Sequence, residues 1–409
     1  MKIVYHHRTR STDAQRIHIQ EIARAFEDLG HTLRMVSLVP VDAEQHNAER
    51  DAGVALWRRL ARRVPFAYDL VQIAYNLAGI PMLMAAVWRR KVDFIYERYS
   101  LFNFAGAVTA RLCRLPLVLE VNSPFALEQQ RDGEIRLPRL AAWSERTICN
   151  MATRVIVVST PLKRIMEGAG VRPEKLEVMT NGVRLSDFQA QAKDAALEES
   201  LGLRGATVIG FVGWFRNWHG LDLLIEAFHR SGLARKRVKV LLIGDGPAMG
   251  RLQERVRQAG LQDRVIFTGP LPHAEVPSHL NLIDIAVQPS ANEYCCPMKI
   301  LEYMALGKPV VAPRQENIRE IVREGEEAIL FTPGDAASFA AALERLAGNP
   351  AERLRFGANA RMAVHNRGYL WRANAARVVA GCQALHDQIA ESGENCEPVP
   401  APSRIGGES

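Results

Sequence analysis

Short apolar runs alternate with longer amphipathic stretches along almost the whole chain. Runs of four to seven mainly apolar residues, such as those at 2–5, 94–97 and 117–121, are typical of buried strands. Between these runs, apolar residues recur at three- and four-residue spacing, which predicts helices. Regular alternation of the two patterns predicts βα units built around parallel sheets.

The predicted elements fall into two series. Strands are expected at 2–5, 32–39, 94–97, 117–121 and 154–158, and then at 207–212, 238–243, 265–268, 285–288 and 309–312. Helices are expected at 14–29, 104–112, 139–149 and 160–167, and then at 221–229, 249–259, 276–282, 297–305, 317–323, 335–346 and 351–362. Two doubly wound α/β domains follow, because 409 residues exceed the ~100–200 of one ordinary domain.

The domain boundaries are read from composition. We expect a first domain at 1–190 and a second at 191–367, joined through the polar stretch 189–200. A last helix at about 368–390 is expected to pack back onto the first domain. Residues 391–409 have almost nothing to bury, which predicts a disordered tail.

The charge is unevenly distributed over a chain that is 48% hydrophobic and 24% charged, a composition typical of soluble globular enzymes. Residues 1–190 hold 27 Lys and Arg against 20 Asp and Glu, which accounts for the whole net charge of +7. A solvated basic face and an anionic partner, such as a membrane surface or a lipid-linked phosphate, both explain this excess. The segment 57–63 adds a basic amphipathic edge that could rest on anionic lipid.

The longest apolar stretch, 66–88, contains Asp69, Gln72 and Asn76 and a Gly79-Ile-Pro81 break. These features favour a buried or interfacial helix over a membrane span. The first residues do not read as a signal peptide, and the six cysteines show no metal-ligand spacing. We therefore expect a cytoplasmic protein, with a peripheral position at the inner face of a membrane as an open alternative.

The segment 292–316 is the most informative about chemistry. Lys299 and Glu302 lie three residues apart at the start of a predicted helix, between a proline turn and a short apolar strand. A cation suits a phosphate and a carboxylate suits a sugar diol. A nucleotide sugar carries both groups.

Two glycine turns of the second domain are candidates for the same site. Gly213 follows a strand, and Arg216 stands just beyond it, where it would face either a diphosphate or only solvent. Gly244 opens a Gly-x-Gly-x-x-x-Gly pattern, which we read as a tight turn near a base pocket rather than as a nicotinamide fingerprint.

The rim of the first sheet offers further candidates, because open α/β sheets bind ligands outside the carboxyl ends of their strands. Candidates for contacts to an acceptor or to the transferred sugar are His6, Arg8, Arg10, His18, Arg98 and Glu120. The histidines are equally well explained as loop and packing residues.

Several ordered segments resemble the retaining glycosyltransferases of family four. They lie at 20–31, 159–163, 180–184, 211–228 and 297–312, and the resemblance extends to about residue 389. It implies the GT-B fold, in which two Rossmann-like domains face each other across a cleft. It also implies hexosyl or N-acetylhexosaminyl transfer from a nucleotide-diphosphate sugar to a glycan or lipid-linked acceptor, in cell-surface or exopolysaccharide synthesis.

The resemblance assigns roles to matching positions. Glu302 corresponds to the second glutamate of the family's E-x7-E pattern, which holds the ribose hydroxyls, and Arg216 and Lys299 correspond to cations on the donor diphosphate. Asn122 stands where many relatives carry a histidine that faces the transferred sugar. Other expected donor contacts are Gly213, Gly244, Met298 and Ile300.

The chain also departs from the family pattern. Tyr294 lies eight residues before Glu302, so the first glutamate of the pattern is missing, or is displaced by one residue to Glu293. His219 stands where many relatives place a lysine. Glu293 and Tyr294 are therefore candidates for setting the sugar preference, and Arg216 is expected to carry more of the phosphate charge.

The leaving-group chemistry follows from the groups present. No D-x-D motif occurs, so we expect fixed cations to neutralise the nucleoside diphosphate, with no metal and no other cofactor. No carboxylate is clearly placed as a nucleophile, which agrees with the front-face displacement proposed for the family. Nucleic acid is not an expected partner.

Two other interpretations remain open. A catalytically silent GT-B protein that binds a nucleotide sugar or a glycan would explain Tyr294 and His219. A sugar epimerase on the same fold would need carboxylate and histidine acid–base groups at the sugar carbon, and the rim offers no clear set of them.

Overall fold

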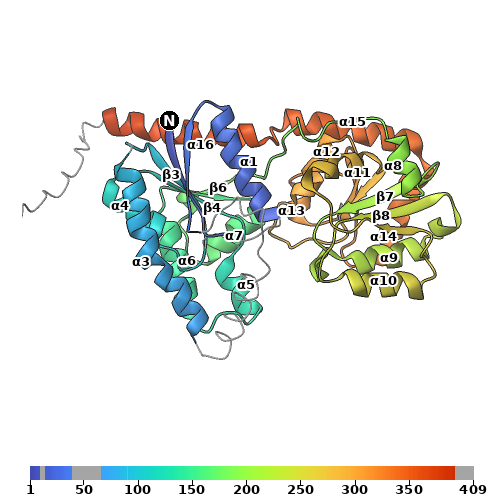
Figure 1. Cartoon of the computed structure of the whole chain (residues 1–409), viewed down its shortest axis with the longest axis horizontal. Helices are drawn as coiled ribbons and strands as arrows, with labels where there is room; N and C mark the ends of the chain where they lie inside the picture. The colour runs from blue at the N-terminus through green and yellow to red at the C-terminus, as the bar shows by residue number, and fades with distance from the viewer. Residues whose placement is uncertain (10–13, 39–65, 90, 392–409) are drawn as a thin grey trace, which may run out of the picture. The chain divides into compact units, whose positions relative to one another are not determined.

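The computed structural model describes residues 1–9, 14–38, 66–89 and 91–391, which form two compact α/β units (Figure 1). The first unit comprises Met1–Val157, Lys163–Glu177 and the chain from Ala375 onward. The second comprises Val158–Leu162 and Val178–Asn374. The sequence placed the boundaries at about 190 and 368. Arg10, the basic segment 57–63 and the expected tail after residue 391 lie outside the described residues.

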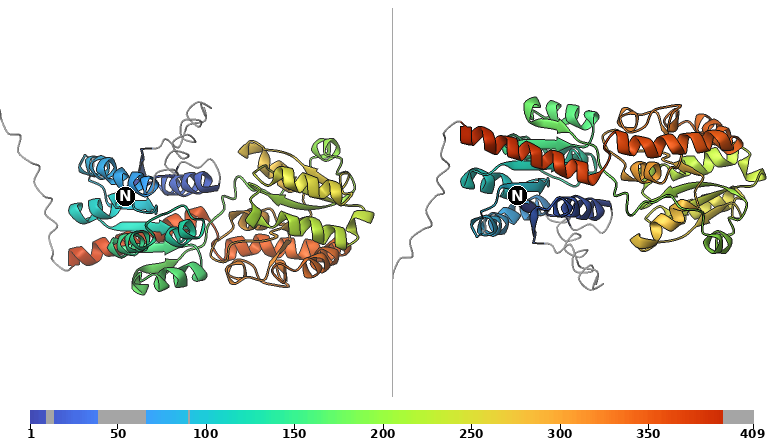
Figure 2. Two further views of the ribbon diagram at one scale, coloured as in Figure 1. Left: turned by 90° about the horizontal axis from the view of Figure 1, so that it is seen from below. Right: turned by 90° about the horizontal axis from the view of Figure 1, so that it is seen from above.

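The first unit is built on a six-stranded sheet of order β2-β1-β3-β4-β5-β6, whose recorded strand pairs are parallel. Its strands are β1 (Lys2–His6), β2 (Thr32–Val36), β3 (Phe94–Arg98), β4 (Leu117–Val121), β5 (Arg154–Val157) and β6 (Leu176–Val178). Its helices are α1 (Ala14–Asp28), α3 (Ala67–Trp88), α4 (Ala105–Cys113), α5 (Phe125–Arg131), α6 (Pro138–Met151), α7 (Thr160–Gly168) and the 3-10 turn η1 (Pro173–Lys175). Helices cover both faces of the sheet (Figures 1 and 2).

The order in which strands are added to the first sheet reverses at β1. The strand β1 pairs with β2 on one side and with β3 on the other, so the carboxyl ends of β1 and β3 form a topological switch point. Every residue of β3 and β4 is buried, as expected for inner strands covered on both faces. On one face, the Tyr96 ring packs edge-to-face against the rings of Tyr5 and Phe26.

The second unit has a parallel sheet of order β12-β11-β10-β7-β8-β9. Its strands are β7 (Thr207–Val212), β8 (Val238–Ile243), β9 (Val265–Phe267), β10 (Ile285–Val287), β11 (Val310–Pro313) and β12 (Ala328–Phe331). Its helices are α8 (Ala195–Ser200), α9 (Leu221–Arg230), α10 (Met249–Gln258), α11 (Val276–Asn281), α12 (Met298–Ala305), α13 (Glu316–Arg319), α14 (Ala336–Gly348), α15 (Pro350–Asn366) and the 3-10 turns η2 (Asn217–His219), η3 (Leu233–Arg235) and η4 (His273–Glu275). Here the switch point lies between β7 and β10. Both sheets confirm the predicted fold class of doubly wound parallel α/β units.

The last helix, α16 (Trp371–Glu391), begins in the second unit and belongs to the first from Ala375. Within the first unit, Arg377 pairs with Glu177 at 2.5 Å, and His386 Nε2 lies 3.0 Å from the carbonyl oxygen of Asp93. These polar contacts fix the helix on the first unit.

Several elements were not predicted from the sequence. The strands β6 and β12 and the helices α5 and α8 are short, and their apolar runs are weak. The stretch predicted as the interdomain join contains α8, whose first turn is capped by Asp194. It belongs to the second unit, where the Lys193 ammonium lies 2.7 Å from the Asp284 carboxylate. The expected strand at 32–39 ends at Val36.

Candidate functional site

Two glycine turns follow neighbouring strands of the second unit at their carboxyl ends. Gly213 follows β7 with φ 142°, and Gly244 follows β8 with φ 124°. A side-chain carbon on Gly244 would overlap the carbonyl oxygen of Gly213, so the two turns pack backbone against backbone. Glycine is required at both positions because other residues rarely adopt these angles. Both glycines are half-buried, and the Gly213 turn lies beside the switch point of the sheet, where a ligand can approach the backbone.

The Lys299 side chain reaches the first of these turns. It projects from the first turn of α12, and its Nζ lies 3.9 Å from the centre of the Phe211 ring. It also lies 3.4 Å from His219 Nε2. A side-chain carbon at Gly213 would approach Nζ to 2.9 Å, so the glycine makes room for the cation. Lys299 is thereby held at the helix start beside the carboxyl end of β7.

The electrostatics of this cluster favour an anion. Burial lowers the pKa of Lys299 to about 7, although the nearby Glu302 carboxylate opposes the shift. Burial, reinforced by the Lys299 charge, lowers the pKa of His219 to about 2, so this imidazole stays neutral at physiological pH. A phosphate bound at Nζ would favour the charged form of Lys299 and raise its pKa again. His219 therefore does not replace the charge of the lysine that many relatives carry there.

The loop before α12 is held by side chains from distant parts of the chain. Three polar residues donate hydrogen bonds to its backbone carbonyl groups: Ser159 to Tyr294 (2.7 Å), Asn181 to Cys296 (2.8 Å), and Asn317 to both Asn292 (2.9 Å) and Cys295 (2.7 Å). Sequence reasoning assigned none of the three donors to the site. The available signal was that Ser159 and Asn181 lie in segments that carry the family resemblance.

The residues of the second unit that were predicted to bind the donor differ in burial and in their distance along the chain from Lys299. Met298 begins α12, and the half-buried Glu302 lies one turn after Lys299. Arg216 is exposed at the start of η2, where its backbone N–H meets His219 Nδ1 at 3.4 Å. Ile300 is fully buried and its N–H bonds to Pro297, so its position does not fit a ligand contact. In the loop before α12, the remaining candidates are the exposed Glu293 and the half-buried Tyr294.

In the first unit, His6 forms a buried pair with Glu97 at the switch point. His6 Nδ1 lies 2.9 Å from Glu97 Oε2, and its Nε2 lies 3.1 Å from the Tyr75 hydroxyl oxygen. Asn103 donates a further hydrogen bond of 3.2 Å to the same carboxylate. The Glu97 carboxylate lies against Gly106 at the start of α4, where no side chain would fit. This pair is braced from several elements, and sequence reasoning missed Tyr75 as its partner.

A second buried group surrounds Glu120 at the end of β4. Its carboxylate lies 3.3 Å from His18 and 3.0 Å from Arg98, and it accepts hydrogen bonds from the Tyr96 hydroxyl at 2.6 Å and from the Asn122 amide. Although burial opposes the shift, the charges of His18 and Arg98 hold the pKa of Glu120 below its ordinary value. The structure thus brings together four residues that the sequence proposed separately.

Two other residues of this rim have different surroundings. Arg8 donates hydrogen bonds of 2.8 and 3.1 Å to Gln72, and its guanidinium lies over the Tyr75 ring. Burial, together with the His6 and Arg98 charges, lowers the pKa of His7 to about 4. Among the described residues, neither ring nitrogen of His7 has a hydrogen-bond partner.

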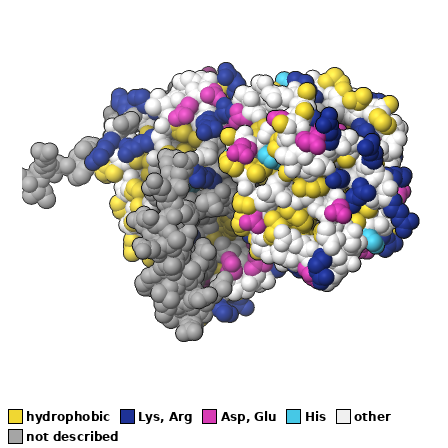
Figure 3. Space-filling view, turned by 45° about the vertical axis from the view of Figure 1, so that its right-hand side comes forward, with side chains coloured by type: hydrophobic (Ala, Val, Ile, Leu, Met, Phe, Trp, Pro, Cys, Tyr) yellow, Lys and Arg dark blue, Asp and Glu magenta, His cyan; other side chains and the backbone are white. Residues whose placement is uncertain are grey.

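Side chains of one charge do not form a separate patch on the face shown in Figure 3. Over the face shown in Figure 3, Lys and Arg side chains are interspersed with Asp, Glu and apolar side chains. The glycine turns, the buried cation and the braced loop therefore locate the candidate site of the second unit.

Comparisons with known proteins identify the family and the fold of the chain. Residues 15–187 match the family model of Glycosyltransferase Family 4, and residues 206–349 match that of Glycosyl transferases group 1. The chain is 28% identical over 263 residues to an alpha-D-kanosaminyltransferase of Streptomyces kanamyceticus, which covers 63% of this chain and 68% of that protein. It is 28% identical over 344 residues to a D-inositol 3-phosphate glycosyltransferase of Kineococcus radiotolerans, which covers 79% and 78%. The crystal structure of Anabaena HepE in complex with UDP and glucose superposes with a TM-score of 0.66 at 19% identity, covering 96% of this chain and all of that one.

Proposed function

Since the chain belongs to glycosyltransferase family four and has the GT-B fold, we propose that it transfers a sugar from a nucleotide-diphosphate donor to a glycan or lipid-linked acceptor, with retention of anomeric configuration. The acceptor is a component of a cell-surface glycan or exopolysaccharide. The sugar is a hexose or an N-acetylhexosamine.

The observation that carries this proposal is the placement of Lys299 at the Gly213 turn. Its ammonium stands beside the half-buried Gly213 backbone at the switch point, at the start of α12, where the helix dipole also favours an anion. The donor diphosphate fits there, with Glu302 one turn further along for the ribose hydroxyls. Arg216, on the loop that follows Gly213, supplies a planar fork for the second phosphate.

In the proposed mechanism, fixed cations stabilise the leaving nucleoside diphosphate. As the bond from the sugar to the diphosphate breaks, negative charge grows on the leaving oxygen, and preorganised cations stabilise it without reorganisation. Lys299 and Arg216 have this role, so no metal is required. We expect turnover to survive a chelator such as EDTA. Activity that is lost in EDTA and restored by magnesium would contradict this reasoning.

Donor turnover by single variants tests the proposal. The panel contains UDP- and GDP-linked hexoses and N-acetylhexosamines, and UDP is tested first because HepE was crystallised with it. We expect Lys299→Ala or Arg216→Ala to lower turnover by ~10²–10³-fold and Glu302→Ala to weaken donor binding. Lys236→Ala, which alters an exposed lysine of the same unit, is the matched control. Unchanged turnover in Lys299→Ala and Arg216→Ala, together with unchanged donor binding by Glu302→Ala, would refute the site.

A silent binding module is the second candidate, favoured by Tyr294 at the position of the missing glutamate and by the neutral His219. Both functions predict thermal stabilisation by a nucleotide sugar, worth about 2.7 kcal/mol at a ligand concentration 100 times its Kd. Only the enzyme releases free nucleoside diphosphate. Stabilisation without release, across the donor and acceptor panels, would identify the binding module.

The acceptor and the location belong to the same proposal. We place the protein in the cytoplasm, at the inner face of a membrane that presents a lipid-linked acceptor. The Kineococcus relative is named for D-inositol 3-phosphate, so this compound is included in the acceptor screen. Transfer to it alone would show that the acceptor is soluble.

A further inference from the structure

One whole face of α3 is apolar and exposed. The exposed positions follow helical spacing along the full length of the helix: Leu70, Val71, Ala74, Leu77, Ala78, Pro81, Ala85 and Trp88. Leu77 is 82% exposed, and no charged residue occurs from Leu70 to Trp88. At 1.5 Å per residue the face is about 27 Å long. Soluble proteins seldom leave a contiguous apolar surface of this length in contact with water.

The opposite face of α3 is fixed to the first unit. Asp69 accepts hydrogen bonds of 3.0 Å from the backbone N–H groups of Arg136 and Leu137. The Asn76 amide oxygen accepts a bond of 2.7 Å from Phe104, and Leu83 is fully buried. The helix has the length and hydropathy of a membrane span. Crossing a bilayer would break these contacts, so the exposed face is available only as a surface.

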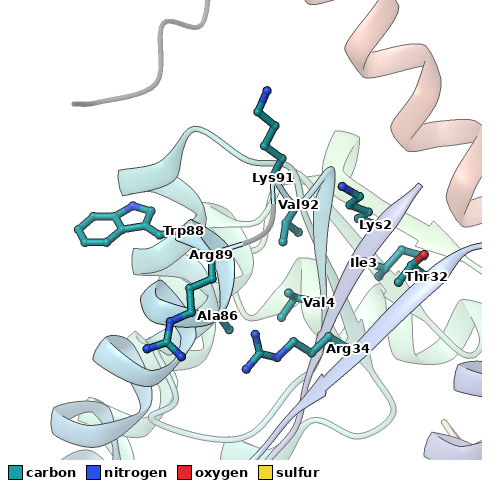
Figure 4. A pocket seen from close by; sticks show the side chains of 10 residues that line it. All are labelled: Lys2, Ile3, Val4, Thr32, Arg34, Ala86, Trp88, Arg89, Lys91 and Val92. Atoms are coloured by element: carbon teal, nitrogen blue, oxygen red, sulfur yellow. The ribbon is translucent and has the colours of Figure 1, made fainter. Parts of the chain in front are cut away.

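Cations gather where this face ends. Trp88, the last residue of α3, lines a pocket of about 440 Å³ together with Lys2, Arg34, Arg89 and Lys91. Figure 4 shows the Trp88 ring at the outer edge of the pocket and the Lys91 side chain extending outward. The nearby Asp93 carboxylate is engaged by the backbone N–H of Lys2 at 2.6 Å. Apolar and cationic surfaces are therefore continuous through Trp88.

We propose that α3 docks the protein on an anionic lipid bilayer. The apolar face of the helix lies in the plane of the interface, and the cations around the pocket contact lipid phosphates. This arrangement has the features of interfacial helices: an apolar face, a tryptophan at the boundary, and basic residues beside it. The inference deepens the proposed membrane location, and its test does not depend on glycosyl transfer.

Charge complementarity favours lipid over a second copy of the chain. The positive excess of the sequence lies wholly within residues 1–190, and four cations of this part of the chain line the pocket at the end of the apolar face. A bilayer surface supplies both an apolar interior and negative phosphates. A second copy that used the same face would bring the same cations against these.

Vesicle binding by the full chain tests the proposal. The probes are vesicles of pure phosphatidylcholine and vesicles with about one third phosphatidylglycerol. We expect cosedimentation with the anionic vesicles that weakens as salt rises. Leu77→Glu should weaken binding by at least ~10-fold, because it places a charge in the apolar face. Leu354→Glu, at a 77% exposed position of α15 in the second unit, should leave it unchanged.

A second pair of variants, one in the pocket and one control, tests the contribution of the cations. Arg89→Glu should weaken binding to anionic vesicles, whereas Lys236→Glu, which reverses an exposed charge of the second unit, should have little effect. Thermal unfolding checks that the variants are folded, and donor turnover with a soluble acceptor should be unchanged in Leu77→Glu. Inorganic phosphate at millimolar concentration should displace no more protein from vesicles than sodium chloride of the same ionic strength. Greater displacement by phosphate would identify the pocket as a site for a free phosphate and overturn the bilayer contact.

Two further outcomes would overturn the proposal. One is the absence of binding to anionic vesicles by the wild-type chain, whatever its donor turnover. The other is a dimer, seen by light scattering, that Leu77→Glu converts to a monomer. In that case a second copy, and not lipid, covers the face.

Discussion

The affinity for a nucleoside diphosphate should fall steeply as pH rises above 7, because Lys299 must be charged to bind it. Burial sets the pKa of the free lysine at about 7. Bound phosphate moves this pKa back toward the ordinary value of about 10.4. The bound state therefore holds more protons than the free state between these two values, and by linkage binding weakens as protons are removed.

The size of the effect follows from the free pKa. At pH 9 only about one Lys299 in a hundred is charged in the free protein, so Kd should rise nearly tenfold per pH unit between about 7.5 and 9.5. His219 contributes nothing in this window, since its pKa of about 2 leaves it neutral throughout. Binding at pH 8.5 should take up close to one proton per nucleotide.

Titration calorimetry in buffers of different ionisation enthalpy measures both the Kd and the proton uptake. Lys299→Arg is the control, because an arginine stays charged through the window and should give a nearly flat Kd. Any slope left in this variant reports other groups. A wild-type Kd that is constant from pH 7 to 9, or an equal slope in Lys299→Arg, would refute the reasoning.

Three further substitutions probe the supports of the two units. Gly213→Ala should raise the donor KM by ~10-fold or more by displacing the lysine ammonium, whereas Gly232→Ala faces open space and should not. Asn317→Ala removes two hydrogen bonds to the loop before α12 and should also raise the donor KM, unlike Asn359→Ala, which removes one bond at the surface. Glu97→Ala should cost ~3–5 kcal/mol in urea unfolding, because it strips a buried histidine of its partner. A cost below ~1 kcal/mol would contradict the last prediction.

Much of the fold could be read from periodicity, because a parallel sheet covered on both faces imposes continuous apolar runs. The strands β1, β3, β4, β7 and β8 begin where the pattern placed them and end within a residue of it. Shorter elements were not predicted, because contacts with neighbouring elements stabilise them more than any apolar pattern of their own. The helix α8 lies in a polar, charged stretch and is specified by the Asp194 cap and by contacts to the second unit.

In the candidate site too, some residues could be identified from local sequence and others only from the tertiary structure. Lys299 and Gly213 were identifiable because their residue types and local context indicate phosphate chemistry. The three side chains that brace the loop before α12 were not, because Ser159, Asn181 and Asn317 are far apart in the sequence. Only the tertiary fold brings them to the same backbone segment.

The sequence by itself determined the two α/β units, the family and the residues that carry charge, since periodicity and ordered motifs are local properties of a chain. The tertiary structure decided how those residues are used. It placed Lys299 against Phe211, and burial lowers the pKa of this lysine; it paired His6 with Glu97 in a buried cluster; and it left one face of α3 exposed. These outcomes depend on burial and on contacts between distant segments, which local sequence patterns do not specify.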